Sequence, residues 1–108
     1  MAQNFRRYTS NNVGTAAETL FTANSYDTIV GISVANVAAT SVIASIYIND
    51  GTDDIYLVKD APIPVGSALQ VLDGGAKFVV QSGDALKVIS DTASSLDVWV
   101  STVDAIST

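Results

Sequence analysis

Apolar and polar residues alternate along most of the chain with a period of two, the pattern of half-buried β-strands. The segments that follow it are residues 28–37, 42–49, 54–60, 67–72, 76–81, 85–90 and 96–103. Turn-forming groups such as Asn49-Asp50-Gly51 and Ser82-Gly83-Asp84 separate them at roughly 8–12-residue spacing, which is typical of sandwiches and barrels. Because these segments are rich in Val, Ile and Thr, we predict an all-β chain.

The same alternation predicts which side chains face the core. In residues 28–37, Val30, Ile32 and Val34 share the inward face. In residues 42–49, Tyr47 points outward, and in residues 96–103 Trp99 does so. A β-bulge would reverse such an assignment, because one extra residue moves every following side chain to the other face.

The 108 residues suit a single domain. Residues 1–14 hold no sustained alternation, so we interpret them as an N-terminal arm or a short first strand. Pro62 and Pro64 remove ladder donors, which favours an edge strand or an extended crossover there. We predict an arm over residues 1–14 and, over residues 15–108, an antiparallel β-sandwich of about seven or eight strands, jelly-roll or Ig-like.

Charge changes the picture in two ways. Charged residues make up only 15% of the chain, against about 25% in ordinary domains, which favours a subunit packed against others. The net charge is −6 with only five basic residues, so we expect neither nucleic-acid binding nor attachment to an anionic membrane. The opening residues carry no apolar stretch typical of a signal peptide, and we therefore expect synthesis in the cytoplasm without a secretion signal.

Residue types exclude much of catalytic chemistry. Without His or Cys, these residues cannot form a Ser-His or Cys-His pair, a disulfide or a zinc-thiolate site. We expect no enzyme activity and no cofactor. The densest acidic stretch, Asp50 to Asp54, could offer oxygen ligands to calcium, but it lacks EF-hand spacing. We therefore interpret it as a hairpin tip and predict no metal site.

Two groups of residues are candidates for an interface between subunits. Arg6 and Arg7, the only arginines, lie side by side near the N-terminus of an acidic chain, and could dock on a neighbouring subunit or belong to a polar terminus. An apolar set on the outward face of the later strands is either covered within the monomer or exposed as an interface. The candidate interface residues are Phe5, Arg6, Arg7, Tyr8, Val79, Ile89 and Trp99.

The C-terminal half carries a family resemblance. The segments Asp60-Ala61-Pro62-Ile63-Pro64-Val65-Gly66-Ser67-Ala68-Leu69, Gln81-Ser82-Gly83-Asp84-Ala85-Leu86-Lys87-Val88 and Ser95-Leu96-Asp97-Val98-Trp99-Val100-Ser101 resemble small virion structural proteins of tailed bacteriophages, especially phages of cyanobacteria and other marine bacteria. The resemblance implies a β-sandwich, a homo-oligomer and attachment to the virion.

We therefore expect a capsid decoration or cement subunit that stabilises the head lattice, with the major capsid protein or another virion protein as partner and a trimer as the working oligomeric state. A neck, tail or baseplate component is the alternative within this class. A carbohydrate-binding or adhesive sandwich is the alternative from another class, since this fold hosts many functions.

Overall fold

Antiparallel strands make up the computed structural model, which describes residues 4–23, 27–72 and 77–104. In chain order they are β1 (Asn4–Val13), β2 (Glu18–Thr22), β3 (Asp27–Asn36), β4 (Val42–Asn49), β5 (Asp54–Ile63), β6 (Ala68–Leu72), β7 (Phe78–Val80), β8 (Ala85–Ser90) and β9 (Leu96–Asp104). None of the described residues is helical. The all-β prediction is confirmed, with β1 and β2 added to the strands that alternation had located.

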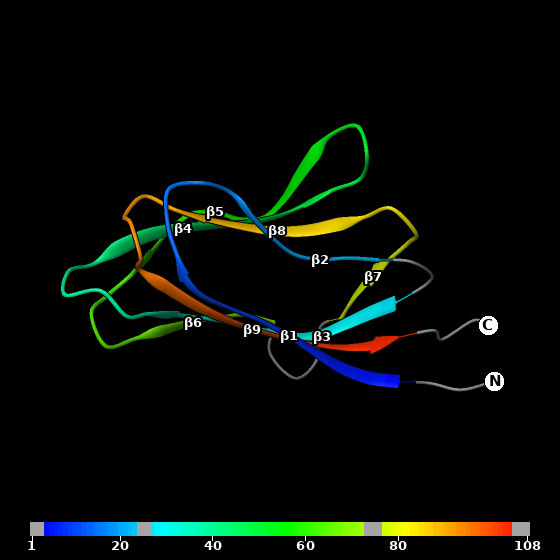
Figure 1. Cartoon of the computed structure of the whole chain (residues 1–108), viewed down its shortest axis with the longest axis horizontal. Coiled ribbons are helices and arrows are strands. Elements are labelled where there is room, and N and C mark those ends of the chain that lie inside the picture. The colour runs from blue at the N-terminus through cyan, green and yellow to red at the C-terminus, as the bar shows by residue number, and fades with distance from the viewer. Residues whose placement is uncertain (1–3, 24–26, 73–76, 105–108) are drawn as a thin grey trace.

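The strands form two stacked sheets, seen as two layers in Figure 1. Sheet A has the order β1-β9-β3-β6, with β7 also paired to β3, and sheet B has the order β2-β8-β4-β5. The resulting pairs β1·β9, β2·β8, β3·β6 and β4·β5 are those of a long antiparallel hairpin rolled into a sandwich. This is the jelly-roll arrangement, one of the two topologies expected from the sequence.

The N-terminal segment is part of the sandwich and not a separate arm. Residues 4–13 form edge strand β1, which pairs with β9 from Asn4↔Asp104 onward. The Tyr8 ring stacks on Phe21 of β2, with the ring centroids 4.5 Å apart, and so connects the edges of the two sheets. Of the two interpretations of this segment, the structure shows the first strand. Alternation is weak here because β1 is an edge strand. Even its inward-facing side chains, such as Tyr8, are only partly buried, so they need not be strongly apolar.

A bulge in β3 corrects the predicted inward face. The pairing of β3 with β9 shifts register between Ile29 and Gly31, so Val30 is displaced from the inward row. Ile29 is fully buried in its place, and Ile32 and Val34 keep their predicted positions. The extra residue inverts the alternation at this point, as bulges do.

Strand β5 forms the edge of sheet B that its prolines predict. Pro62 pairs in register with Ile43 of β4, at a position where no outer neighbour needs a backbone donor. Asp60 adopts a positive φ of 55° at a bulge, and its backbone N–H donates to Ser45 Oγ over 2.9 Å. Pairing with β4 resumes after this bulge, so the edge strand continues to Ile63, past the end expected at residue 60.

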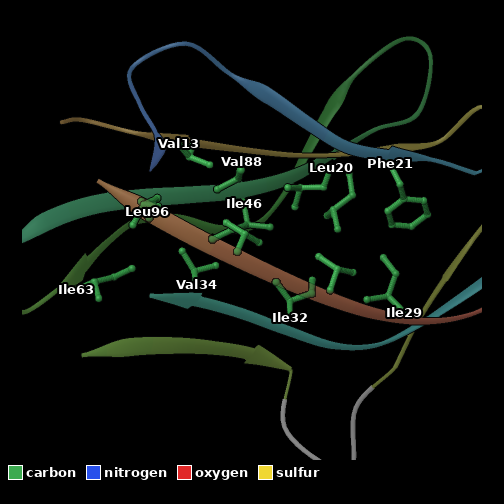
Figure 2. Close-up of a cluster of buried hydrophobic side chains, with 14 of the residues drawn as sticks. Val13, Leu20, Phe21, Ile29, Ile32, Val34, Ile46, Ile63, Val88 and Leu96 are labelled. Atoms are coloured by element: carbon green, nitrogen blue, oxygen red, sulfur yellow. The ribbon is translucent and has the colours of Figure 1, made fainter. Parts of the chain in front are cut away.

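The core lies between the two sheets and is made of branched aliphatic side chains. Figure 2 shows Ile29, Ile32 and Val34 of sheet A pointing toward Ile46 and Val88 of sheet B. All five are at most 1% exposed. Both sheets contribute alternate residues, which is why one face of each strand reads as apolar.

A buried amide closes one end of this core. Asn36, at the end of β3, is 6% exposed. Its Nδ2 donates to the carbonyl oxygens of Thr40 and of Ile63, each over 2.9 Å, and its Oδ1 accepts from the Ala38 N–H over 2.8 Å. Asn36 thereby joins the end of β3 in sheet A to the end of β5 in sheet B.

Within the described ranges, no helix is long and apolar enough to cross a membrane.

Candidate functional site

The outward face of sheet A gathers most of the sequence-predicted interface residues. Phe5 and Arg7 of β1, Val79 of β7 and Trp99 of β9 are exposed and belong to this sheet. Their inward neighbours, such as Val80 and Val100, are buried, so strict alternation places all four on the solvent side. The candidate site is therefore this face.

A row of four paired residues, three of them apolar, crosses the sheet at the end where β1 starts and β9 stops. Phe5 pairs in register with Val103, Val103 with Thr28, and Thr28 with Val79. Phe5 is 81% exposed and Val79 is 70% exposed, values that are high for large apolar side chains. We call Phe5, Val103, Thr28 and Val79 the terminal row. Figure 1 shows the starts of β1 and β3 and the end of β9 together at this end of the sheet.

Trp99 lies apart from the terminal row, nearer the middle of the sheet. Thr9 and Ser33 are its cross-strand neighbours, and it is 52% exposed. The Arg7 guanidinium carbon lies 5.4 Å from the centre of the indole ring, a cation–π distance. Because Arg7 and Ser101 separate Trp99 from Val103, these residues form two surfaces and not one continuous apolar patch.

A shallow trough of about 590 Å³ opens beside Trp99. Strands β1, β9 and β3 supply its lining, which includes Thr9, Asn11, Ser33, Ala35 and Asp97 in addition to Arg7 and Trp99. These side chains are small or polar, which leaves the space in front of the indole open.

Three sequence-predicted interface residues do not belong to this face. Ile89 of β8 is on the outward face of sheet B, where it pairs with Ser45, so it cannot form one patch with Val79 and Trp99. This corrects the grouping of those three residues: alternation shows that a side chain points outward but not from which sheet. Arg6 and Tyr8 alternate with Phe5 and Arg7, and Tyr8 packs against the core cluster.

On the outward face of sheet B, one aromatic residue covers another. Tyr47 was expected outward, and it is on that side, yet it is only 7% exposed because the Tyr56 ring packs against it with the ring centroids 5.0 Å apart. The Lys59 ammonium lies 4.9 Å from the centre of the Tyr56 ring. Burial, followed by the nearby Asp54 carboxylate, raises the pKa of the Tyr47 hydroxyl.

The acidic stretch Asp50 to Asp54 has the geometry of a hairpin turn. Asp50 Oδ1 accepts from the backbone N–H groups of Thr52 and Asp53 over 3.0 and 2.8 Å. These bonds, with that of Asp53 the stronger, lower the pKa of the Asp50 carboxyl. Among the residues that the structure describes, no group of three or more acidic side chains is arranged to hold a metal ion.

Sequence reasoning missed Val103 and the polar lining of the trough. Val103 falls on the outward face by alternation, but only pairing with Phe5 and Thr28 makes it the centre of a row. Thr9, Ser33 and Asp97 are unremarkable polar residues in the sequence. Their common feature, proximity to Trp99, comes from the register between three strands that are distant in the chain.

Comparison with known proteins adds structural neighbours. No protein-family model matches the sequence, and no curated protein matches it. A chain from Bacillus endospore appendages, described as a novel family of disulfide-linked pili, has a TM-score of 0.56 at 12% identity and covers 94% of this chain and 84% of its own length.

Two crystal structures of a pentameric capsid protein isolated from metagenomic phage sequences each have a TM-score of 0.50 at 18% identity and cover 94% of this chain. This chain spans 62% and 60% of those capsid chains, which is less than two thirds of their length. At such identities the likeness is one of fold: structural proteins of a phage particle and of a pilus share this sandwich.

Proposed function

We propose that this protein is a bacteriophage virion structural protein, and that it serves as a capsid decoration or cement subunit on the head lattice. The observation that carries the proposal is the terminal row, which crosses strands β1, β9, β3 and β7 at one end of sheet A, with the strongly exposed apolar side chains of Phe5 and Val79 at its two ends and the half-buried Val103 and Thr28 between them. Exposed contiguous apolar surface marks an interaction site in soluble proteins. The fold likeness to a pentameric phage capsid protein and the family resemblance of the C-terminal half support the virion as its location.

The terminal row suits contact between copies of this chain. Phe5 and Val79 at its two ends supply large apolar groups, and the chain as a whole is poor in charged residues, as the centres of interfaces are. Closed rotational symmetry is the rule for such homo-oligomers. We propose a ring, with five copies as the expected number in place of three, because the phage capsid neighbours are pentameric.

The proposal includes no catalytic role and no cofactor, nucleic acid or membrane partner. It rests on residue types: the 108 residues contain no His or Cys, and their net charge is −6. The major capsid protein is the proposed partner. A neck, tail or baseplate position involves the same kind of contact and differs in where the subunit is found on the particle.

A subunit of a surface appendage is a second candidate, favoured by the TM-score of 0.56 to the pilus chain over 84% of that chain. These 108 residues could not use the disulfide links named for those pili, because they contain no cysteine. A filament would instead depend on non-covalent contacts that propagate without closing.

The mass of the particle in solution tests the role of the terminal row. We expect wild-type protein to sediment as a closed homo-oligomer, and Phe5→Ser and Val79→Ser each to shift it toward the 11.2 kDa monomer. Ile55→Ser is the matched control, because Ile55 is a 53% exposed apolar residue on the other sheet. A wild-type monomer at high concentration, or equal loss of assembly in the Ile55 variant, would overturn the assignment.

Electron microscopy and composition separate the candidate functions. A decoration subunit is recovered from purified phage particles in a fixed ratio to the major capsid protein and is seen on the head. Localisation to the neck or tail would exclude the decoration role but keep the virion assignment. Filaments formed by the purified chain alone would favour the appendage subunit.

A further inference from the structure

We propose that the trough beside Trp99 is a binding site for a neutral oligosaccharide. The site is separate from the terminal row, and the proposal does not depend on the function proposed above. It is supported by an aromatic ring in contact with an arginine, polar groups with hydrogen-bonding capacity left over, and an open volume of about 590 Å³, which is within the range of ligand sites.

The indole ring is held in place from one side. Arg7 pairs in register with Ser101, so it approaches Trp99 from the Ser101 side with its guanidinium carbon 5.4 Å from the ring centre. Asp97 and Ala35, which line the trough, pair with each other on the opposite side of Trp99. Arg7 therefore supports the ring from the Ser101 side and lines the trough together with it, while Asp97 and Ala35 line the trough on the other side of Trp99. A ring fixed in this way loses little conformational freedom on binding.

The floor of the trough is low because its residues are small. Thr9 and Ser33 flank Trp99 directly, and Ala35 follows Ser33 on the same face of β3. None of these side chains reaches the height of an indole. The trough therefore has an aromatic ring at one side of a low, polar floor, where a saturated ring could pack against the indole.

The polar groups around the ring offer both donors and acceptors. Ser33 Oγ accepts a hydrogen bond from Gln70 Nε2 over 3.0 Å, which leaves the Ser33 hydroxyl proton for a ligand. Asp97 Oδ1 accepts from the Asn12 N–H over 3.1 Å, and its Oδ2 has no hydrogen bond to any described residue. Asn11 and Thr9 are exposed at the same wall.

This combination matches a pyranose better than other ligands. A sugar ring has C–H groups on its face, which pack on an aromatic ring, and hydroxyls on its edge that both donate and accept. An anion would meet Asp97, whose charge offsets that of Arg7, within a chain of net charge −6. An apolar ligand or aliphatic protein surface would cover the polar groups of Ser33 and Asp97 without satisfying them, which is costly.

The single tryptophan makes the site directly measurable, because all indole fluorescence comes from Trp99. The probes are neutral hexasaccharides of glucose, mannose and N-acetylglucosamine, titrated into the full chain. We expect at least one to change the emission saturably and to shift backbone amide NMR signals of Thr9, Ser33 and Asp97.

Two variants and a control test the binding site. Ser33→Leu retains the fluorophore but fills the floor, and we expect it to weaken binding roughly tenfold or more, as does Trp99→Ala followed by NMR. Tyr56→Ala removes an exposed aromatic residue beside a lysine on the other sheet and should leave binding unchanged. Both site residues are exposed or half-buried, so thermal melts should show that the variants fold.

Some results would overturn the inference. These are the absence of a response to every hexasaccharide, or binding that persists in Ser33→Leu. A third is wild-type Trp99 emission that changes with protein concentration in the absence of sugar, together with loss of assembly in Trp99→Ala, which would assign the trough to contact between copies. Failure of Phe5→Ser to disrupt assembly bears only on the terminal row, so the two proposals fail independently.

Discussion

Replacing Asn36 with alanine should strongly destabilise the sandwich without altering either surface. The side chain satisfies three backbone groups at once: the carbonyls of Thr40 and Ile63 and the N–H of Ala38. The bond to Ile63 is buried, so losing it leaves a carbonyl without a partner, which costs about 1–3 kcal/mol. The other two are part-buried and accessible to water, and each contributes the smaller net value of about 0.5–1.5 kcal/mol.

Together these terms predict a loss of roughly 2–6 kcal/mol in the free energy of unfolding. For a domain of about 100 residues, this lowers the melting temperature by roughly 10–25 °C. Urea unfolding followed by far-UV circular dichroism measures the change, with the slope m expected to stay constant because the same surface is exposed. Asn11→Ala is the matched control: Asn11 is exposed in β1, and its loss should change stability by less than about 0.5 kcal/mol.

A second substitution separates hydrogen bonding from packing. Asn36→Asp preserves the shape and the acceptor for the Ala38 N–H but removes both donors, and it directs a carboxylate at the Thr40 and Ile63 carbonyls. We expect it to be at least as destabilised as Asn36→Ala at neutral pH. The reasoning is refuted if Asn36→Asp unfolds like the wild type, or if Asn36→Ala loses no more stability than the Asn11 control.

Three further predictions concern other parts of the sandwich. Tyr8→Ala should lower the free energy of unfolding by about 1–3 kcal/mol, because it removes the stack on Phe21 that connects β1 to β2. Deletion of residues 2–8 should destabilise the protein further, and an unchanged thermal melt of the deletion variant would show that β1 is dispensable. Stability should fall as the pH drops below 3.8. Hydrogen bonds from the Ile43 N–H and the Thr92 hydroxyl lower the pKa of the Asp91 carboxyl below 3.8 in the folded protein. The contribution of ionised Asp91 to stability is therefore complete above pH 3.8 and is lost as the pH falls through the lower folded pKa. Asp91→Asn, which retains an acceptor oxygen, should flatten this acid slope, and an identical slope in melts across pH would contradict the linkage. Millimolar calcium or a chelator should leave the melting temperature unchanged if Asp50 to Asp54 is only a turn; a large rise with calcium would show binding to the native state.

Local pattern determined the strands of this protein. Alternation located β4 and β8 with the bounds that the structure shows and placed β9 within one residue at its end. It could do so because a strand with one buried face must alternate, whatever its partners are. The prolines of β5 likewise predicted an edge strand, since a residue without a backbone N–H is tolerated only where no neighbouring strand needs that hydrogen-bond donor.

Pairing between distant segments determined the rest. The bulge in β3 replaced Val30 with Ile29 in the core, and its position depends on the register with β9. The weakly patterned N-terminus became β1 because β9 offered it a free edge.

The candidate sites also depend on pairing between distant segments. Val79 and Ile89 look alike in the sequence but lie on opposite sides of the sandwich, because β7 pairs with sheet A and β8 with sheet B. Phe5 meets Val103, and Arg7 meets Trp99, across contacts that span nearly the whole chain. A sequence fixes each side chain's orientation relative to its own strand, whereas which residues share a surface is decided by the register and order of strands. Those are set only when both sheets close around one core.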